Sequence, residues 1–173
     1  MNNDKRIKKE VSSGSSIISL NSRILKEEKP KSKILIVDDN DILLRTLNKM
    51  LFDLIMKRNE NIEIIKGDDG LDILNYIIKD QFNGNLIKCI ITDENMEFIN
   101  GTEAIGFLNR LHRRNKIRSL SVIILSSYED NYIKKVSLTE SWRCEYMSKP
   151  ISINQLEKKL IDMNIFTDWT ISK

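Results

Sequence analysis

The sequence is poor in residues that form covalent or metal cross-links. Its 173 residues include two cysteines, Cys89 and Cys144, and neither has a cysteine or histidine neighbour at metal-ligand spacing. Both lie in or near apolar runs, so we expect free thiols in a reducing compartment. The sole histidine, His112, stands beside two arginines, and we expect it to be a solvated surface residue. These features argue against a disulfide framework and a zinc site.

Long apolar runs are also missing. No run approaches the roughly 18 to 20 residues that span a bilayer, and the N-terminus is polar instead of resembling a signal core. We therefore expect a cytoplasmic protein with no membrane span. Few residues follow the last predicted helix, so we expect no DNA-binding or catalytic output domain after it.

The formal net charge of +3 is unevenly distributed. Residues 1–32 hold eight Lys or Arg against four Asp or Glu, a net charge of +4 that leaves −1 for the remainder. We interpret 1–32 as a disordered basic extension, for which a solvated linker is favoured over contact with anionic lipid or RNA. The near-neutral remainder gives no support for direct nucleic-acid binding.

Short apolar runs alternate with segments of helical periodicity from residue 33 onward. The runs are rich in β-branched residues and predict buried strands at 33–37, 62–65, 86–92, 120–125 and about 145–147. A weaker helix is predicted at 130–139. The stronger helical faces are Leu43, Leu47, Met50, Leu51 and Leu54; Leu71, Leu74, Ile77 and Ile78; Ala104, Leu108 and Leu111; and Ile153, Leu156, Leu160 and Met163. This alternation predicts an α/β fold, a doubly wound five-stranded parallel sheet with helices on both faces.

Charged or hydroxyl side chains that could form a site stand after four of the five predicted strands. Asp38 and Asp39 follow the first, Asp93 the third, Ser126 the fourth and Lys149 the fifth. Because ligands of such sheets bind beyond the carboxyl ends of the strands, we expect these side chains to share one pocket. Clustered carboxylates repel one another unless a cation compensates, and Mg²⁺ suits such an oxygen-rich site.

This set of residues predicts phosphoryl transfer onto a carboxylate. With Mg²⁺, the Lys149 ammonium and the Ser126 hydroxyl around it, Asp93 is the candidate nucleophile that forms an acyl phosphate. Each residue also has a purely structural interpretation, as a helix cap, a turn or a surface lysine. Their placement at the same end of successive strands favours the functional interpretation.

Four motifs carry a family resemblance: ILIVDDN ending at Asn40, IITDENM ending at Met96, IILSS ending at Ser127 and YMSKP ending at Pro150. In order and spacing they resemble the receiver domains of response regulators and hybrid histidine kinases, over residues 33–165 with a tail at 166–173. The resemblance implies a flavodoxin-like (βα)5 fold with strand order 2-1-3-4-5. It also implies that a histidine kinase or histidine phosphotransfer protein is the phosphodonor.

The resemblance also implies a role for each site residue. Asp93 would be the phosphoacceptor and a metal ligand, and the chain would be no enzyme beyond assisting its own phosphorylation and dephosphorylation. The other roles are Asp39 as a direct Mg²⁺ ligand, Asp38 as a ligand through water, Asn95 as a carbonyl ligand, Lys149 and Ser126 as phosphoryl contacts, and Tyr146 as the switch aromatic.

The sequence departs from the family pattern in two places, and two alternative functions stay open. Glu97 stands where the family usually has proline, and 129–142 lacks the usual small residues. A receiver-like interaction module that has lost phosphorylation would keep the same fold. A magnesium-dependent phosphatase with an aspartyl nucleophile is disfavoured, because such an enzyme needs an acid two residues beyond its nucleophile and position 40 is Asn40. The family favours a cis bond before Pro150, with which the sequence is compatible.

Overall fold

The computed structural model describes residues 30–127 and 142–167. The strands are β1 (Ser32–Val37), β2 (Ile62–Gly67), β3 (Ile87–Asp93), β4 (Ser121–Ser126) and β5 (Arg143–Ser148). The helices are α2 (Asp41–Arg58), α3 (Gly70–Phe82), α4 (Gly101–Arg113) and α5 (Ile153–Asp162). Each of these elements matches a predicted one, whereas the weak helix predicted at 130–139 lies outside the described residues. None of the described helices is long and apolar enough to cross a membrane.

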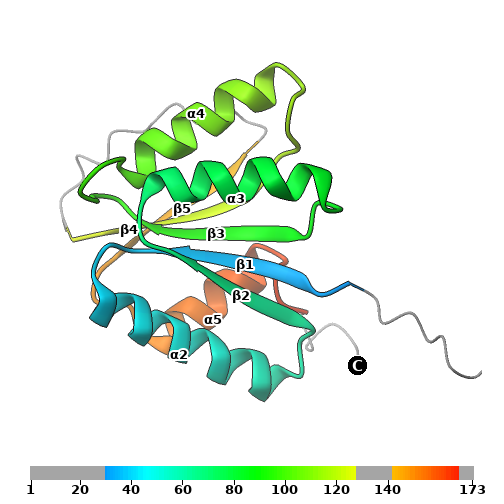
Figure 1. The fold of residues 1–173 in the computed structure, drawn as a ribbon. Helices are drawn as coiled ribbons and strands as arrows, with labels where there is room; N and C mark the ends of the chain where they lie inside the picture. The colour runs from blue at the N-terminus through cyan, green and yellow to red at the C-terminus, as the bar shows by residue number, and fades with distance from the viewer. Residues whose placement is uncertain (1–29, 128–141, 168–173) are drawn as a thin grey trace, which may run out of the picture. The chain divides into compact units, whose positions relative to one another are not determined.

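The five strands form one parallel sheet in the order β2-β1-β3-β4-β5 (Figure 1). At the carboxyl end of β1, Val37 pairs with Gly67 of β2 on one side and with Thr92 of β3 on the other. At the same edge, Ser126 of β4 pairs with Ser148 of β5. This order confirms the predicted doubly wound fold, and it brings the ends of β1, β3, β4 and β5 to one edge of the sheet.

Helices cover both faces of the sheet. Figure 1 shows α2 and α5 on one face and α3 and α4 on the other. Each pair of helices buries its own apolar cluster against alternating strand residues. Strand β1 is therefore enclosed on both sides, as its continuous apolar run predicts, and Ile34, Leu35, Ile36 and Val37 are all fully buried.

Polar residues fix where the helices begin. The Asn40 side chain accepts hydrogen bonds from the backbone N–H groups of Ile42 and Leu43, so α2 begins directly after the two aspartates that follow β1. Asp69 caps α3 by accepting from the N–H of Leu71. The acidic residues near the edge of the sheet therefore include both site candidates and structural caps.

The buried face of α3 differs from the prediction. We expected Leu71, Leu74, Ile77 and Ile78 to share one buried face, but Leu71 and Ile78 are 53% and 43% exposed. Ile77 is buried as predicted and Leu74 is half-buried, while Ile73, which the prediction did not include, is also buried. The sequence of α3 is apolar on more than one side, so periodicity alone does not select the side that faces the sheet.

Candidate functional site

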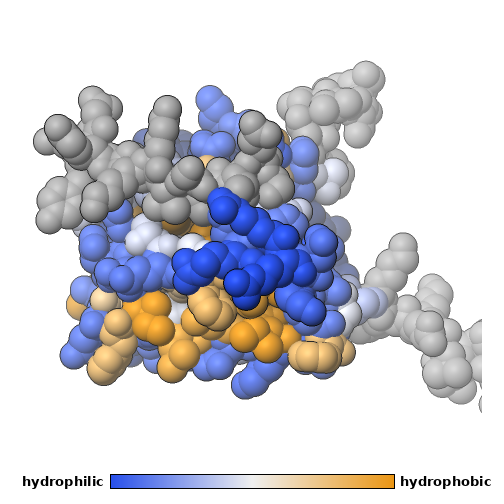
Figure 2. Space-filling view, turned by 90° about the horizontal axis from the view of Figure 1, so that it is seen from above, coloured by the Kyte–Doolittle hydropathy of each residue, from blue (hydrophilic) through white to orange (hydrophobic). Residues whose placement is uncertain are grey.

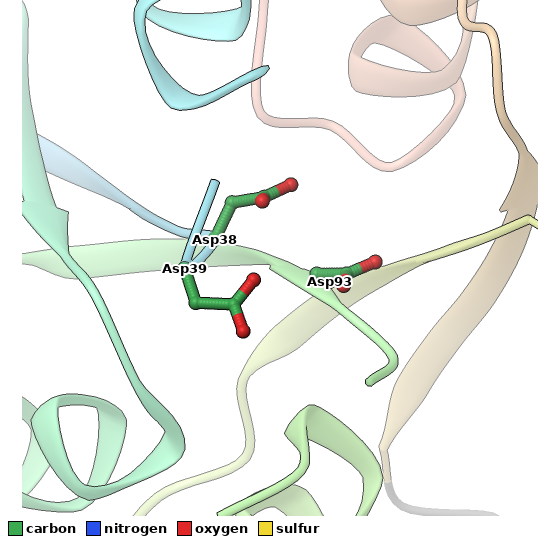
Figure 3. A group of neighbouring side chains, drawn as sticks. All are labelled: Asp38, Asp39 and Asp93. Carbon is green, nitrogen blue, oxygen red and sulfur yellow. The ribbon is translucent and has the colours of Figure 1, made fainter. Parts of the chain in front are cut away.

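Three carboxylates meet at the edge where the strands end. Asp38 and Asp39 follow β1, and Asp93 is the last residue of β3, the strand beside it. One carboxylate oxygen from each of the three lies within 4.8 Å of the others (Figure 3). Asp38 and Asp93 are buried and Asp39 is exposed. The parallel pairing of β1 with β3 is thus sufficient to explain why residues so far apart in the sequence form one acidic cluster.

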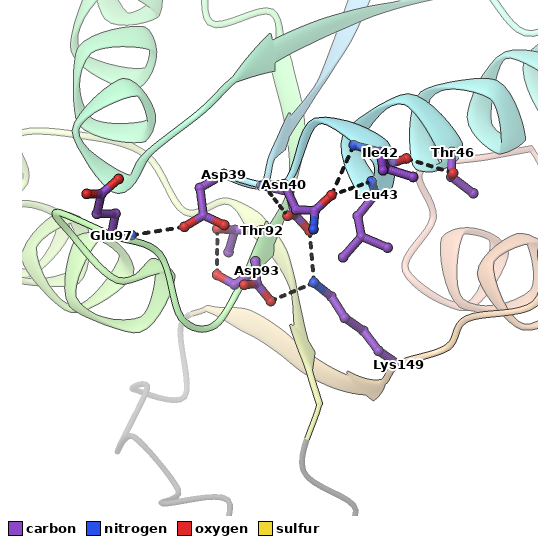
Figure 4. A network of polar contacts seen from close by, with 10 residues as sticks. Asp39, Asn40, Ile42, Leu43, Thr46, Thr92, Asp93, Glu97 and Lys149 are labelled. Atoms are coloured by element: carbon purple, nitrogen blue, oxygen red, sulfur yellow. Dashed lines mark hydrogen bonds and ion pairs between the residues drawn. The ribbon is translucent and has the colours of Figure 1, made fainter.

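Lys149 joins this cluster from the far side of β4. Its Nζ lies 2.8 Å from Asp38 Oδ2 and 2.8 Å from Asp93 Oδ1 (Figure 4). The lysine follows β5 immediately, and the Lys149–Pro150 peptide bond is cis, in agreement with the resemblance. The backbone N–H of Lys149 also donates to the carbonyl oxygen of Ser126 at 2.7 Å. One ammonium group therefore faces three carboxylates, and the cluster keeps an excess of negative charge.

Burial and charge shift the pKa values of this cluster. Burial raises the pKa of the Asp93 carboxyl above its usual range, although the hydrogen bond and charge of Lys149 act in the opposite direction. Burial by itself lowers the pKa of Lys149, but the hydrogen bonds and charges of Asp38 and Asp93 together outweigh burial and raise it. Lys149 is thus a cation at neutral pH, and its partner Asp93 is held in a poorly solvated environment.

The loop after β3 is tied to the acidic cluster by backbone hydrogen bonds. Asp39 Oδ2 accepts from the N–H of Glu97 at 3.0 Å (Figure 4). Asp69 Oδ2 accepts from the N–H groups of Phe98 and Ile99 at 3.2 and 3.0 Å. A proline at position 97, which is usual in the family, has no N–H and cannot donate to Asp39. The departure at Glu97 therefore supplies a contact that proline excludes.

Asp69 is a residue of this site that sequence reasoning missed. The turn that contains it was visible as a Gly-Asp-Asp-Gly break between a strand and a helix. That signal predicts a helix cap, which Asp69 is, but not its bonds to a loop 29 and 30 residues further along the chain. Close packing supports the same contact, because a Cβ atom on Gly70 would lie 2.4 Å from the carbonyl oxygen of Ile99.

The remaining predicted residues lie on the neighbouring strands β4 and β5 and in the loop after β3. Ser126 ends β4 and is buried, and Tyr146 lies on β5 opposite Ile124 and is half-buried. Burial, with smaller contributions from Cys144 and Glu94, raises the pKa of Tyr146 to about 12. Asn95 lies in the loop after β3 with its side chain exposed. The strand ends therefore bring together Asp38, Asp39, Asp93 and Lys149, with Ser126 at the end of the neighbouring strand.

The single histidine and the two cysteines of the sequence are not part of the acidic cluster. His112 is half-buried instead of solvated: its Nδ1 is 2.9 Å from the carbonyl oxygen of Ile117, and its ring lies edge-on to Trp142 at 5.9 Å. It stands in the last turn of α4, at the end of that helix away from Asp93. Cys89 and Cys144 are both free, as expected, and burial raises the pKa of each thiol.

The chain is similar to several solved receiver domains. It shares 26% sequence identity with a two-component response regulator from Cytophaga hutchinsonii, covering 79% of this chain and 99% of that one with a TM-score of 0.58. A response regulator receiver domain from Clostridium thermocellum matches at 21% identity, covering 76% and 93% with a TM-score of 0.58. A chemotaxis response regulator of Vibrio cholerae matches at 18% identity, covering 78% and 99% with a TM-score of 0.55.

No curated protein sequence matches the chain significantly. The family model for the response regulator receiver domain, however, matches residues 34–161, which span all the described strands and helices except the first two residues of β1 and the last residue of α5. With the parallel sheet and the acidic edge described above, this match shows that the chain belongs to the response regulator receiver domain family.

Proposed function

We propose that this chain is a phosphoacceptor in a histidine-to-aspartate phosphorelay and that Asp93 accepts the phosphoryl group. The observation that carries the proposal is the convergence of three carboxylates within 4.8 Å at the sheet edge, with the Lys149 ammonium in contact with two of them. A structural cap or turn needs none of these contacts. A buried carboxylate beside a lysine and an acidic cluster instead suits attack on a phosphoryl group.

The residues present fit a magnesium ion. Three carboxylates carry more negative charge than Lys149 neutralises, and their oxygens are the hard ligands that Mg²⁺ prefers. Asp38, Asp39 and Asp93 would hold the ion, together with the backbone carbonyl of Asn95. When bound, Mg²⁺ would neutralise charge that develops on the phosphoryl oxygens. These oxygen ligands and their excess negative charge therefore support Mg²⁺ as the cofactor.

The chain's own residues account for the other requirements of transfer. A carboxylate oxygen of Asp93 forms the new P–O bond while the P–N bond of a phosphohistidine donor breaks, and the donor nitrogen keeps the electron pair and takes a proton from water. Lys149, already 2.8 Å from Asp93, would contact one phosphoryl oxygen, and the Ser126 hydroxyl would contact another. The donor would be a histidine kinase or a histidine phosphotransfer protein in the cytoplasm, and we propose no direct contact with nucleic acid.

The alternative functions receive less support from the geometry. Asn40, the residue at the acid position of a phosphatase of the aspartyl type, caps α2 with its side chain and cannot act as an acid. A receiver-like module that has lost phosphorylation needs no lysine between two buried carboxylates, yet Lys149 is held there. The arrangement therefore favours a working phosphoacceptor.

Acetyl phosphate provides the test of this proposal. With Mg²⁺ the full chain should gain one phosphoryl group by intact mass, and chelation of the metal should prevent the gain. Asp93→Asn keeps the size of the side chain and removes its anionic nucleophile, so this variant should gain none. Asp72→Asn, on α3, is the matched control and should react as the parent does. A phosphorylated Asp93→Asn protein would contradict the assignment of Asp93.

A further inference from the structure

The outer face of α3 carries apolar side chains that the fold does not bury. Leu71, Ile78 and Phe82 are 53%, 43% and 86% exposed, and Leu74 between them is half-buried. These four residues, which we call the α3 stripe, follow one another at intervals of three and four and so share one side of the helix. In Figure 2, which looks down on the layer of α3 and α4, apolar side chains gather along one border beside a strongly hydrophilic area.

Three residues of the α3 stripe, Leu71, Ile78 and Phe82, are exposed and lie outside the core, whereas Leu74 also packs against it. Ile73 and Ile77 already supply the buried face of α3, and both are at most 1% exposed. Phe98 extends the apolar surface, because it is 81% exposed and its backbone N–H shares the Asp69 carboxylate with the N–H of Leu71 at the start of α3. A contiguous apolar surface of this kind on a folded domain marks a contact site more often than chance exposure does.

We propose that the α3 stripe is the contact surface between two copies of this chain, with two α3 helices packed antiparallel across a two-fold axis. The stripe is self-complementary in this arrangement. Leu71 lies opposite the partner's Phe82, and Leu74 lies opposite the partner's Ile78, so apolar side chains meet along the whole stripe. An isologous contact requires this kind of match between a surface and itself.

Charges beside the stripe favour the antiparallel orientation. Asp72 and Lys79 lie on the same flank of α3, seven residues apart, with the exposed Asn75 between them. The two-fold axis keeps these flanks together, so Lys79 approaches the partner's Asp72 and Asp72 approaches the partner's Lys79. Exposed ion pairs contribute little affinity but disfavour wrong orientations. Burial of the α3 stripe therefore drives association, and the two flanking charges set its direction.

The size of the surface indicates a reversible dimer. A stable interface buries about 800 Å² on each partner, which is more than four side chains provide. Phe98, which is 81% exposed, enlarges the apolar contact beside the start of α3. We therefore expect association that depends on protein concentration and needs no phosphoryl group on Asp93.

Sedimentation equilibrium of the full, unphosphorylated chain tests the dimer. The parent protein should approach twice its 20.2 kDa mass as concentration rises. Ile78→Glu places a charge at the centre of the stripe and should raise the dissociation constant roughly tenfold or more. Met56→Glu makes a comparable change at a residue of α2 that is 64% exposed, and it should keep the parent value. Circular dichroism should show that both variants are folded, because neither replaced side chain is buried.

Cross-linking tests the orientation of the two helices. A short bismaleimide should join two copies of Asn75→Cys, which lies near the centre of the antiparallel pair, and should not join two copies of Asp68→Cys beyond its end. The parent protein controls for its own thiols, Cys89 and Cys144. A parent that stays monomeric at every concentration, or an Ile78→Glu variant that dimerises as the parent does, overturns the proposal. A monomer that instead binds vesicles of anionic phospholipid through Ile78 also overturns it, in favour of a lipid surface.

Discussion

Lys149 lies between two of the carboxylates at the site, and its position explains how that site is both acidic and stable. Its ammonium group contacts Asp38 and Asp93 at 2.8 Å each, and its side chain is 16% exposed. Two buried carboxylates so close together would repel each other strongly without this cation. The lysine thus opposes the rise in the pKa of Asp93 that burial and the charge of Asp38 cause.

Replacement of Lys149 by methionine should raise the pKa of Asp93 further. Burial and the charge of Asp38 raise that pKa, while Lys149 and a backbone hydrogen bond from Glu94 lower it, so loss of the lysine leaves only the weaker of the two opposing effects. Carbon-13 NMR of the carboxyl groups in metal-free protein measures the shift. Lys159→Met removes a lysine that contacts Glu145 on β5, and it should leave Asp93 unchanged. An Asp93 titration that is the same in Lys149→Met and in the parent would contradict this account of the cluster.

At the scale of elements, Asp69 joins the start of α3 to the loop that leads from β3 to α4. Its carboxylate accepts three backbone N–H groups, those of Leu71, Phe98 and Ile99. These bonds lower the pKa of Asp69 even though burial acts to raise it. Since Asp39 accepts from the preceding N–H of the same loop, that of Glu97, two acidic residues from different strand ends hold one backbone segment.

Asp69→Ala should destabilise the fold by about 1–3 kcal/mol near neutral pH, because it removes a helix cap and leaves backbone donors without their acceptor. The folded pKa of Asp69 lies below the ordinary value of 3.8, so this stabilisation is fully present above that value and is lost as pH falls through the folded pKa. Urea unfolding over a pH series measures the effect. Asp68→Ala, at the exposed neighbouring residue, is the control and should change little. A deficit that persists unchanged in acid would contradict the role of the ionised carboxylate.

The elements themselves were largely predictable from the sequence. Runs such as 33–37 are too short and too β-branched for helices, and the apolar stripe from Leu43 to Leu54 correctly predicted a helix where α2 lies. The buried face of α3 was wrongly predicted in part, since Ile77 is buried, whereas Leu71 and Ile78 look like core residues in a linear pattern and are exposed in the structure. An apolar residue that serves a contact surface has the same chemistry as one that serves the core, so local periodicity does not separate the two.

At the scale of the whole molecule, the site follows from topology. Parallel strands bring their carboxyl ends to one edge, so Asp38, Asp39 and Asp93 were predictable as neighbours from the sequence alone. Individual contacts were not predictable, because the bonds from Glu97 to Asp39 and from Phe98 to Asp69 depend on the path of a loop. The same sheet links the end of β4 to β5. The Lys149 N–H donates to the Ser126 carbonyl oxygen, and Tyr146 pairs with Ile124, two residues before that serine.

Phosphorylation at Asp93 should reach β5 through Ser126. A phosphoryl group adds negative charge and acceptor oxygens, and if the Ser126 hydroxyl closes on one of them, space opens beside Tyr146 on the adjacent strand. A ligand shifts a conformational equilibrium only through different affinities for the two states. The contact between Ser126 and the phosphoryl group must therefore be stronger in the conformation that phosphorylation favours. Ser126→Ala should then accept a phosphoryl group from acetyl phosphate as the parent does, but the conformational change that follows in β5 should be smaller.

Amide NMR with beryllofluoride and Mg²⁺, used as the phosphate mimic, measures this transmission. The parent should show shifts along Arg143–Ser148 when the mimic binds, and Ser126→Ala should show markedly smaller ones. Ser121→Ala, at the opposite end of β4, should respond as the parent does, because it lies away from the acidic edge. Shifts of equal size in Ser126→Ala and in the parent would mean that phosphate acts on β5 by another route, with Lys149, which contacts Asp93 and follows β5 directly, as the residue to test next.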